Sequence, residues 1–320
     1  MKDIAVLIST YNGEKYLKEQ LDSILLQKFS KANYRMNIFI RDDGSSDDTV
    51  NIIHNYSEKY SNVFLLDSDK NLGFSLSFLT LLKQISADYY FFSDQDDVWM
   101  PGKVELFLDT ITKNNNDQLI CGAFSDSWIA DEQAISTGKR TLTFRSNQIF
   151  KGELEFEQQI FETFVAGASL CINKLARNKI LNYNLNLLSQ LGAHDFLIGL
   201  IISYYGKLCF INTPTLFYRQ TGENFFGARN PNKKSYLWRL KHIKNRVSNV
   251  QTAMAAGAYI SDKKSQFSSE IYNISAGNFS FLKRLLFFTK YRHLVSPKHF
   301  VLMPFVYSVL MKKAIRIKKE

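Results

Sequence analysis

Short apolar runs and segments of helical periodicity alternate over the first hundred residues. The runs are four or five residues long and rich in β-branched or aromatic residues, which is typical of buried strands. They are residues 4–8, 36–40, 63–66 and 89–92. Apolar residues at three- and four-residue spacing follow each of the first three runs and indicate helices. Strands that alternate with helices predict an α/β fold with a doubly wound, mostly parallel sheet.

A polar cluster follows each of these four runs. The clusters are residues 9–12 (STYN), 42–48 (DDGSSDD), 71–73 (NLG) and 93–97 (SDQDD). Because the carboxyl ends of parallel strands lie at one edge of a doubly wound sheet, the four clusters are expected to converge there. One ligand site at that edge is the economical explanation for all of them.

Three carboxylates, those of Asp94, Asp96 and Asp97, fall within four residues at the end of a buried strand. Like charges this close repel one another unless a cation or hydrogen-bond donors compensate. Hard oxygen ligands suit Mg²⁺ or Mn²⁺, which bind through one or two carboxylates and complete their coordination with water and substrate phosphates. The alternative is an acidic turn that caps a helix beginning near Pro101.

The second cluster also has a local explanation. Residues 44–48 fit a tight turn at Gly44 followed by a helix cap. Asp42 and Asp43 remain unexplained, and their carboxylates could accept hydrogen bonds from a ribose hydroxyl or a pyrimidine imide N–H. The hydroxyls, the ring and the amide of residues 9–12 offer stacking and polar contacts to a base, although a helix start explains them nearly as well.

Two later positions are candidates for chemistry. Asp195 precedes an apolar helical segment, where a lone aspartate is most often an N-cap. The same carboxylate can act as a general base that takes a proton from an attacking hydroxyl. His194 is expected to be structural. Arg219 follows the last expected strand and could face a phosphate or pair with a carboxylate of the acidic cluster.

Composition and charge divide the chain in two. Its 320 residues are 45% apolar, which suits one large or two ordinary domains and excludes disordered and fibrous classes. The net charge of +10 is made of −6 over residues 1–228 and +16 over residues 229–320. We expect a catalytic domain over 1–228 and a basic, amphipathic helical region over 229–320. Such a region indicates an anionic partner, either a membrane surface or a nucleic acid.

Cysteine usage and apolar segments bear on location. Cys121, Cys171 and Cys209 are odd in number and lack CxxC spacing, which indicates buried thiols in a reducing cytosol. The apolar run after the N-terminal MKD is too short for a signal peptide. The late run over residues 300–311 is interrupted by proline and falls short of the ~20 residues of a spanning helix. No transmembrane segment is expected.

The motifs STYNGEKYL, DDGSSDDT, NLG, FFSDQDDVWMPGK, GAHDF and YRQTGEN, in this order and at these separations, resemble the family 2 glycosyltransferases with a GT-A fold. The match covers roughly residues 3–228. SDQDDVW and HDF are most similar to the rhamnosyltransferase-like branch of bacterial surface polysaccharide assembly, such as O-antigen or capsule. Each motif alone is weak, but the ordered set is specific. The resemblance implies transfer of a sugar from a nucleotide-diphosphate donor to an acceptor hydroxyl, with inversion.

The resemblance also implies roles in donor binding. Thr10, Tyr11 and Asp43 would hold the nucleoside, and Asp94 would lie near the ribose. The substrate-binding candidates are Thr10, Tyr11, Asn12, Glu14, Asp42, Asp43, Gly73, Asp94 and Arg219.

For the chemical step, the resemblance assigns the base to Asp195 and the divalent metal to Asp96, with Asp94 as a second candidate ligand. A metal can neutralise the charge on a departing diphosphate, and a single displacement needs one base and no covalent nucleophile. Many relatives carry histidine after YRQ, where this chain has Thr221. Threonine is a poor ligand, so a direct metal contact from that loop is not expected.

The resemblance favours L-rhamnose from dTDP-rhamnose as the donor, while UDP-hexoses and UDP-N-acetylhexosamines remain open. The acceptor would be a lipid-linked saccharide, and the enzyme would lie peripherally on the cytoplasmic face of the cell membrane. A nucleotidyltransferase should carry a glycine-rich, basic loop after the first strand, whereas STYNGEKYL has one glycine. A nucleic-acid binder would use the basic C-terminal region. Basic amphipathic helices fit an anionic bilayer at least as well, and the acidic catalytic edge makes nucleic acid the less favoured partner.

Overall fold

The computed structural model describes residues 1–320 except 69, 115–117, 143–151, 222–235, 295–302 and 312–320. The chain divides into two compact units. Unit 1 consists of residues 1–154 and 165–227, and unit 2 of residues 155–164 and 228–320. Residues 155–164 therefore group with the C-terminal unit, which the sequence did not indicate. The functional division at residue 228 stays a prediction.

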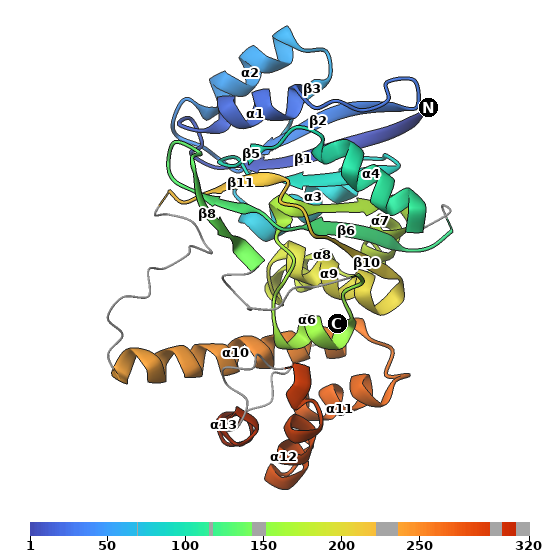
Figure 1. Ribbon diagram of the computed structural model, residues 1–320, viewed down its shortest axis with the longest axis vertical. Helices are drawn as coiled ribbons and strands as arrows, with labels where there is room; N and C mark the ends of the chain where they lie inside the picture. The colour runs from blue at the N-terminus through green and yellow to red at the C-terminus, as the bar shows by residue number, and fades with distance from the viewer. Residues whose placement is uncertain (69, 115–117, 143–151, 222–235, 295–302, 312–320) are drawn as a thin grey trace. The chain divides into compact units, whose positions relative to one another are not determined.

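A seven-stranded sheet forms the centre of unit 1 (Figure 1). In spatial order its strands are β10 (Lys207–Ile211), β6 (Cys121–Ser125), β9 (Leu170–Asn173), β4 (Tyr89–Ser93), β1 (Lys2–Thr10), β2 (Tyr34–Asp42) and β3 (Val63–Leu66). Strands β4, β1, β2 and β3 pair in parallel, so their carboxyl ends share one edge. Strand β9 runs antiparallel to both of its neighbours. The predicted α/β fold with a mostly parallel sheet is confirmed.

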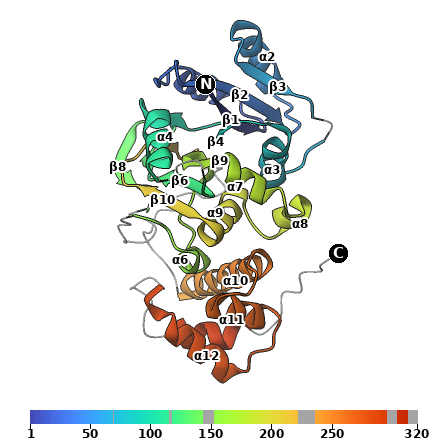
Figure 2. The ribbon, with the colours of Figure 1, turned by 90° about the vertical axis from the view of Figure 1, so that its right-hand side faces the viewer.

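Helices cover both faces of this sheet, as the positions of α4 and α3 in Figure 2 show. One face packs against α1 (Leu17–Leu25), α2 (Thr49–Lys59) and α4 (Lys103–Asn114). The other faces α3 (Phe74–Gln84), α7 (Lys174–Ile180), α8 (Leu185–Gln190) and α9 (His194–Tyr205). Because both faces are covered, consecutive residues such as Val6 and Leu7 are fully buried. This explains why the strands are continuous apolar runs in the sequence.

The three cysteines lie on neighbouring strands of the sheet. Cys121 is on β6, Cys171 on β9 and Cys209 on β10, and all three are buried free thiols. Burial raises the pKa of the Cys171 thiol well above its usual range. The expectation of buried thiols is confirmed.

A second sheet of unit 1 contains β5 (Val98–Trp99), β11 (Leu216–Arg219), β7 (Trp128–Ala130) and β8 (Ser136–Arg140), in that spatial order. Strand β5 begins directly after Asp97, and it pairs with β11, which ends at Arg219. The small sheet therefore ties the acidic residues after β4 to Arg219, far along the sequence.

One segment differs from what its sequence favours. The polar composition of residues 131–160 favours irregular structure, yet the described part contains β8 and the short helix α6 (Phe156–Phe161). The apolar run over residues 164–172 favours a buried strand or a segment facing the sheet, and this is borne out in part, because the buried strand β9 begins at Leu170 after a 3₁₀ turn, η1 (Gly167–Ser169). The apolar character of FVAGASLCI reflects burial, whereas Gly167 and Ser169 make the turn.

Unit 2 is helical in the part that the structure describes. Besides α6 it contains α10 (Tyr236–Ile260), α11 (Gln266–Ser275), α12 (Phe281–Lys290), η2 (Arg292–Leu294) and α13 (Met303–Leu310). Its core is aromatic, because the rings of Phe161, Phe267 and Phe287 lie within 6.3 Å of one another. Among the described residues, no helix combines the length and the apolar character needed to cross a bilayer.

Candidate active site

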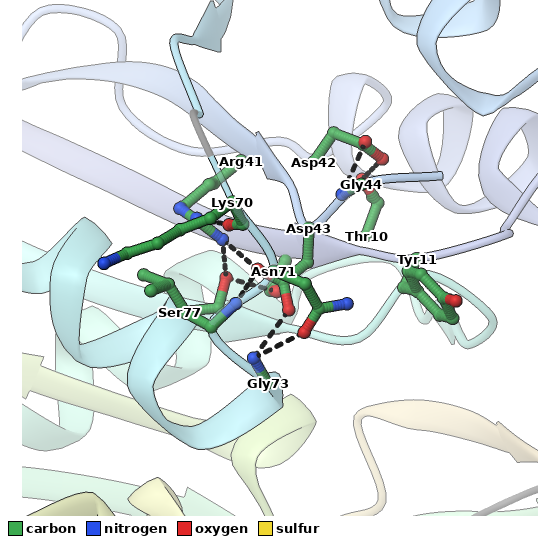
Figure 3. Close-up of polar contacts among 12 residues, drawn as sticks. Thr10, Tyr11, Arg41, Asp42, Asp43, Gly44, Lys70, Asn71, Gly73 and Ser77 are labelled. Carbon is green, nitrogen blue, oxygen red and sulfur yellow. Dashed lines mark hydrogen bonds and ion pairs between the residues drawn. The ribbon is translucent and has the colours of Figure 1, made fainter. Parts of the chain in front are cut away.

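The loops that follow β1 and β2 are joined by hydrogen bonds (Figure 3). The Thr10 hydroxyl donates to Asp42 Oδ1 at 3.0 Å. Asp42 Oδ2 accepts the backbone N–H groups of Gly44 at 3.0 Å and Ser45 at 2.8 Å, so the carboxylate closes its own turn. Asp42 therefore shapes the loop, and its contact with a substrate stays a prediction.

Asp43 joins the β2 loop to the segment before α3 (Figure 3). Its Oδ1 accepts the N–H of Leu72 and its Oδ2 the N–H of Gly73, both at 2.8 Å. Arg41 forms a buried ion pair with Asp43 and also donates to Ser77 Oγ at 3.1 Å. Gly73 has a φ of 73°, a left-handed conformation that glycine adopts at little cost. Asp43 is thus held at the junction of two of the polar loops.

Asn12 and Glu14 fasten the first polar loop to the start of α2. Asn12 Oδ1 accepts the N–H of Ser46 at 2.9 Å, and Glu14 Oε2 accepts the N–H of Asp48 at 2.8 Å. Both acceptors satisfy backbone donors near a helix N-terminus. These bonds fix the loop geometry, and the substrate roles expected for Asn12 and Glu14 stay predictions.

Tyr11 is the exposed member of this group, with 53% of its surface accessible. Gln95 of the acidic loop holds its backbone from both sides, because Gln95 Oε1 accepts the Tyr11 N–H at 2.8 Å and Gln95 Nε2 donates to the Tyr11 carbonyl at 3.0 Å. A Cβ on Gly13 would lie 2.5 Å from Gln95 Oε1, so a larger residue there would displace the amide. The tyrosine ring is therefore presented on a fixed backbone and can stack on a base.

The four polar clusters meet as predicted. Hydrogen bonds join Thr10 to Asp42, Gly73 to Asp43, and Tyr11 to Gln95. The expected convergence at one edge of the sheet is confirmed, and it is made by direct hydrogen bonds between the loops.

The acidic loop, residues 94–97, carries shifted pKa values. Burial, reinforced by the charges of Asp96 and Asp195, raises the pKa of Asp94 to about 7. Burial also raises the pKa of Asp96, which the charge of Arg219 opposes. The pKa of Asp97, a fully buried carboxyl, is raised well above its usual range by burial and then by its two acidic neighbours. Negative charge in this loop is therefore costly.

Lys103 is a buried cation beside this loop that the sequence did not single out. It is 1% exposed, its Nζ lies 4.0 Å from the centroid of the Trp99 ring, and it donates to the carbonyl of Ala168. Burial lowers the pKa of Lys103 to about 7, although the charges of Asp97 and Asp94 oppose that shift. Its ammonium group partly compensates the acidic loop and at the same time tethers η1.

Arg219 is 1% exposed and engaged by protein groups. Its Nε donates to the backbone carbonyl of Asp96 at 2.7 Å, and its Nη2 pairs with Glu19 at 2.5 Å. The guanidinium also lies 4.6 Å from the centroid of the Tyr16 ring. These contacts favour the structural pairing over a phosphate contact, with Glu19 as the carboxylate partner of the guanidinium and Asp97 of the acidic loop accepting the backbone N–H. The substrate role of Arg219 stays a prediction.

Asp195 lies in the first turn of α9, whose N-cap is Ala193, so the expected N-cap position of Asp195 is wrong. Its Oδ2 accepts the N–H of Gly167 at 2.8 Å, and its Oδ1 accepts the N–H of Phe196 at 2.7 Å. The carboxylate is partly exposed and close enough to Asp94 to raise the pKa of that residue. A positioned, partly exposed carboxylate facing the acidic loop can act as a general base.

His194 is buried among aromatic rings next to this carboxylate. It stacks on Phe78 with ring centroids 4.1 Å apart, and Phe92 and Phe74 lie at 5.6 and 6.2 Å. Burial lowers the pKa of His194 to about 4, so the imidazole is neutral near pH 7. The structural role expected for His194 agrees with this packing.

The donor set of the acidic loop fits a hard divalent cation. Asp94 and Asp96 are partly exposed carboxylates whose mutual repulsion a cation would relieve, whereas Asp97 is buried and accepts the Arg219 N–H at 3.2 Å. Within the described ranges, no group of three or more His, Cys, Asp or Glu side chains is placed to hold a metal together. One or two carboxylates completed by water and phosphate match how Mg²⁺ binds. Thr221 is partly exposed, and the expectation that it makes no direct metal contact stays a prediction.

Sequence reasoning missed several residues that hold this site together. Gln95 lies between the carboxylates of Asp94 and Asp96, and its amide gives no sequence signal of its own. Arg41 and Lys103 are isolated basic residues near loop ends, and nothing in the sequence shows that they are buried. Gly167 is a glycine within an apolar run, and nothing else in the sequence indicates that its backbone contacts Asp195.

A mostly parallel sheet with polar loops gathered at the carboxyl ends of β1 to β4, and with a carboxylate facing an acidic loop, is the arrangement of a GT-A glycosyltransferase. The chain belongs to glycosyltransferase family 2, whose family model, "Glycosyl transferase family 2", matches residues 5–174. The family resemblance found in the sequence is therefore confirmed, and the protein is a glycosyltransferase.

Two curated proteins show the range of relatives. The chain is 28% identical over 269 residues to the dTDP-rhamnosyl transferase RfbG of Shigella flexneri, covering 80% of this chain and 87% of that protein. It is 30% identical over 112 residues to the UDP-Glc:alpha-D-GlcNAc-diphosphoundecaprenol beta-1,3-glucosyltransferase WfgD of Escherichia coli, covering 35% of this chain and 42% of that protein.

The fold is shared with solved structures of S. aureus TarS. Residues 1–349 of TarS in complex with UDP align with a TM-score of 0.56 at 15% identity, covering 97% of this chain and 90% of that chain. At this identity the likeness concerns the fold alone, and it confirms the GT-A architecture.

Proposed function

We propose that the protein transfers a sugar from a nucleotide-diphosphate donor to an acceptor hydroxyl with inversion, and that Asp195 is the base. The observation that carries this proposal is the placement of Asp195. Its carboxylate is fixed by the Gly167 N–H, is partly exposed, and interacts electrostatically with the acidic loop. An inverting displacement needs one base on the side of the sugar opposite the leaving group.

The reaction exchanges one bond for another at the anomeric carbon. The acceptor oxygen forms a bond to this carbon while the bond from the carbon to the diphosphate oxygen breaks. The acceptor proton goes to the Asp195 carboxylate, and the electron pair of the broken bond leaves with the nucleoside diphosphate. The chain itself supplies the base, the fixed loops that orient the donor, and the buried environment that limits water.

Asp94 and Asp96 would hold the Mg²⁺ or Mn²⁺ ion. When bound, such an ion neutralises charge that develops on the departing diphosphate. The support is the chemistry of the two carboxylates and the raised pKa of Asp94, which shows that an uncompensated negative charge is disfavoured there. Thr10, Tyr11 and Asp43 would hold the nucleoside, with the exposed ring of Tyr11 stacked on the base.

The donor we favour is dTDP-L-rhamnose. The support is that RfbG, whose name is dTDP-rhamnosyl transferase, matches over 80% of this chain. UDP-glucose and UDP-N-acetylhexosamines are the alternative donors, because WfgD is named for UDP-Glc and TarS was solved with UDP-GlcNAc. The acceptor class we favour is a lipid-linked saccharide of surface polysaccharide assembly, as the diphosphoundecaprenol in the WfgD name suggests. The enzyme would then work as a peripheral protein on the cytoplasmic face of the membrane.

The test measures nucleotide release from dTDP-rhamnose, UDP-glucose and UDP-GlcNAc with Mn²⁺, with a lipid-linked saccharide extract as acceptor. Asp195→Asn keeps the shape of the side chain but removes the base, so turnover should fall about 100-fold to 10,000-fold. Asp96→Ala should also reduce turnover. Asp109→Asn, a change on the exposed face of α4, is the matched control and should keep full turnover. Retained turnover in Asp195→Asn would remove Asp195 as the base, and equal activity of Asp96→Ala would remove its metal role.

A further inference from the structure

Helices α12 and α13 of unit 2 pack side by side. Arg284 of α12 donates from Nε to the carbonyl of Ser308 of α13 at 3.2 Å, and the rings of Phe288 and Tyr307 stack with centroids 4.9 Å apart. Phe288 and Tyr307 are each 1% exposed. The inner sides of both helices are therefore packed into the core of unit 2.

The outer side of the pair is apolar and exposed. It consists of Phe281, Leu282, Leu286 and Phe305, which we call the outer apolar face. Leu282 is 67% and Leu286 70% exposed, and they are one helical turn apart on α12. Phe305 of α13 is 55% exposed, and its ring lies 6.0 Å from that of Phe281. Exposed leucines occur singly on most soluble surfaces, whereas a contiguous apolar group marks an interaction site.

The charge on the two described segments beside this face, α12 and η2, is basic, and the nearest acidic partner is Glu270 of α11, which pairs with Lys290 at 3.5 Å. Lys283 and Lys290 of α12 and Arg292 of η2 are exposed. A second copy of the chain would bring the same positive charge to the contact and be repelled, and a nucleic acid would not use exposed leucines. Apolar residues flanked by cations match an anionic lipid surface.

We propose that the outer apolar face inserts into the interfacial layer of an anionic bilayer while Lys283, Lys290 and Arg292 contact the lipid headgroups. The choice of a membrane as partner rests on the proposed peripheral attachment, whereas the location of the contact comes from the helix pair. Only the outer side of α12 and α13 needs to enter the headgroup region, which agrees with the lack of a spanning helix among the described residues.

The test is flotation of the full chain with vesicles of phosphatidylglycerol and phosphatidylcholine, compared with vesicles of phosphatidylcholine alone. Wild type should float with the anionic vesicles, and Leu282→Ser/Leu286→Ser should bind them at least about tenfold more weakly. The control variant is Leu26→Ser/Ile135→Ser, which changes two leucine-sized residues of unit 1 that are 76% and 64% exposed and should float like wild type.

Three results would overturn the proposal. They are equal flotation of wild type and the α12 variant, absence of wild-type binding to anionic vesicles, and a wild-type dimer in sedimentation that the α12 variant converts to monomer. Circular dichroism checks that the variant is folded, and Lys283→Glu/Lys290→Glu gives a second route to weaker binding without removing leucines. Flotation needs no sugar donor, so its failure is distinguishable from a failure of the glycosyltransfer reaction.

A different observation, in unit 1, concerns the turn η1. Its Gly167 N–H holds Asp195 Oδ2 at 2.8 Å, and its Ala168 carbonyl accepts a bond from the buried Lys103. A Cβ on Gly167 would lie 2.8 Å from His194 Nε2, closer than such atoms approach. Stacking on Phe78 holds the His194 ring in place, so a side chain at position 167 would clash with it.

We infer that Gly167, Lys103 and His194 are positioning residues that set the orientation of the Asp195 carboxylate. Lys103 anchors the turn from the side of the acidic loop, and His194 limits its approach from the side of α9. The absence of a side chain at Gly167 lets the backbone come close enough to donate to Asp195. This inference rests on the proposed role of Asp195 as base.

The test compares kcat and KM for donor turnover in Gly167→Ala and Ser169→Ala. The new methyl group should push the turn away from His194 and weaken the bond to Asp195, so kcat should fall at least about tenfold. The donor KM should change less than twofold, because the loops that carry Thr10, Tyr11 and Asp43 and would hold the nucleoside (the nucleoside loops) are untouched. Ser169→Ala alters the same turn without crowding His194 and should keep wild-type kcat.

Adding His194→Ala to Gly167→Ala removes the clash and should restore part of kcat. An unchanged kcat in Gly167→Ala, or equal losses in kcat and in donor affinity, would overturn the inference. If Gly167→Ala does not fold, Lys103→Met tests the same turn through kcat, which should fall at least about tenfold, because Lys103 also neighbours the acidic loop and its donor KM is not diagnostic. Should Asp195→Asn itself retain turnover, the proposed function fails first, and that result is independent of the Gly167 variants.

Discussion

The nucleoside loops and the acidic loop lie at the same sheet edge, but the negative charge of their carboxylates is compensated within the protein to different extents. In the nucleoside loops, protein donors satisfy the carboxylates of Asp42 and Asp43. In the acidic loop, burial raises the pKa of Asp96, burial and the charges of Asp96 and Asp195 raise the pKa of Asp94, and burial lowers the pKa of the neighbouring Lys103. The carboxylates of the nucleoside loops have their hydrogen-bond partners within the protein. Negative charge in the acidic loop stays unfavourable until a cation or substrate binds there.

This difference separates binding from chemistry. Loops whose hydrogen bonds are already made lose little freedom when a nucleoside binds, so they favour affinity. Groups held with uncompensated charge interact most strongly with the charge that appears during the reaction.

Breaking the Asp43 pair should have the largest effect on stability. Asp43→Ala leaves the buried Arg41 guanidinium without its ion-pair partner, so the free energy of unfolding should fall by about 3–5 kcal/mol in urea denaturation. The control is Asp3→Ala, which breaks an exposed pair with Arg35 and should cost less than about 1 kcal/mol. Equal losses in the two variants would contradict the preorganised character of the nucleoside loops.

Acidification should destabilise the protein through His194, which is buried next to Asp195. The pKa of His194 is lowered to about 4 from an ordinary value near 6.5, so below pH 6.5 the unfolded chain takes up a proton that the folded chain refuses. This contribution to stability is present above pH 6.5 and is lost as pH falls towards 4, by about 3 kcal/mol in total. His194→Phe should flatten that part of the stability profile, whereas replacement of the exposed His54 by Gln should leave it unchanged. An unaltered profile in His194→Phe would contradict the buried neutral state.

Tyr11 should affect nucleotide affinity alone. Tyr11→Ala removes the exposed ring and should weaken dTDP or UDP binding by about 1–3 kcal/mol, a typical value for stacking on a base. Tyr11→Phe keeps the ring and should bind within about twofold of wild type. Calorimetric titration measures both, and an equal loss in the two variants would show that the hydroxyl rather than the ring makes the contact.

The smallest predicted effect is the pH dependence of metal binding. A carboxyl must lose its proton to bind a cation, and the pKa of Asp94 is raised to about 7. Mn²⁺ affinity should therefore rise by up to about tenfold per pH unit below pH 7 and level off above it. Asp94→Asn should remove most of this dependence in a fluorescence or calorimetric titration. An affinity that is constant from pH 6 to pH 8 would exclude Asp94 as a ligand.

The sequence predicts one of these regions better than the other. Strand runs and the polar residues after them are local, so the convergence of the loops near Thr10, Asp42 and Gly73 followed from the topology of a parallel sheet. The bond from Lys103 to Ala168 joins residues 65 apart in the sequence, and the bond from Gly167 to Asp195 joins residues 28 apart, so no local pattern indicates them. Asp195 could be nominated from its motif, but the expected N-cap role was wrong because Ala193 occupies that position.

Secondary structure shows the same limit. The apolar run over residues 63–66 located β3 to the residue, since buried strands are bounded by polar turns. The turn η1 was missed because an apolar run looks alike whether the chain extends or turns. The helix α6 was missed because it is short and packs against unit 2 rather than against its neighbours in sequence.

The most direct measurement is donor-nucleotide affinity alongside turnover in Asp195→Asn and Asp43→Ala. Each variant is titrated with dTDP and UDP in Mn²⁺ and assayed for nucleotide release under the same conditions. If binding and chemistry are separate, Asp195→Asn keeps nucleotide affinity within about twofold and loses about 100-fold or more of turnover. Folded Asp43→Ala loses nucleotide affinity. Equal losses of affinity and turnover in Asp195→Asn would contradict the account.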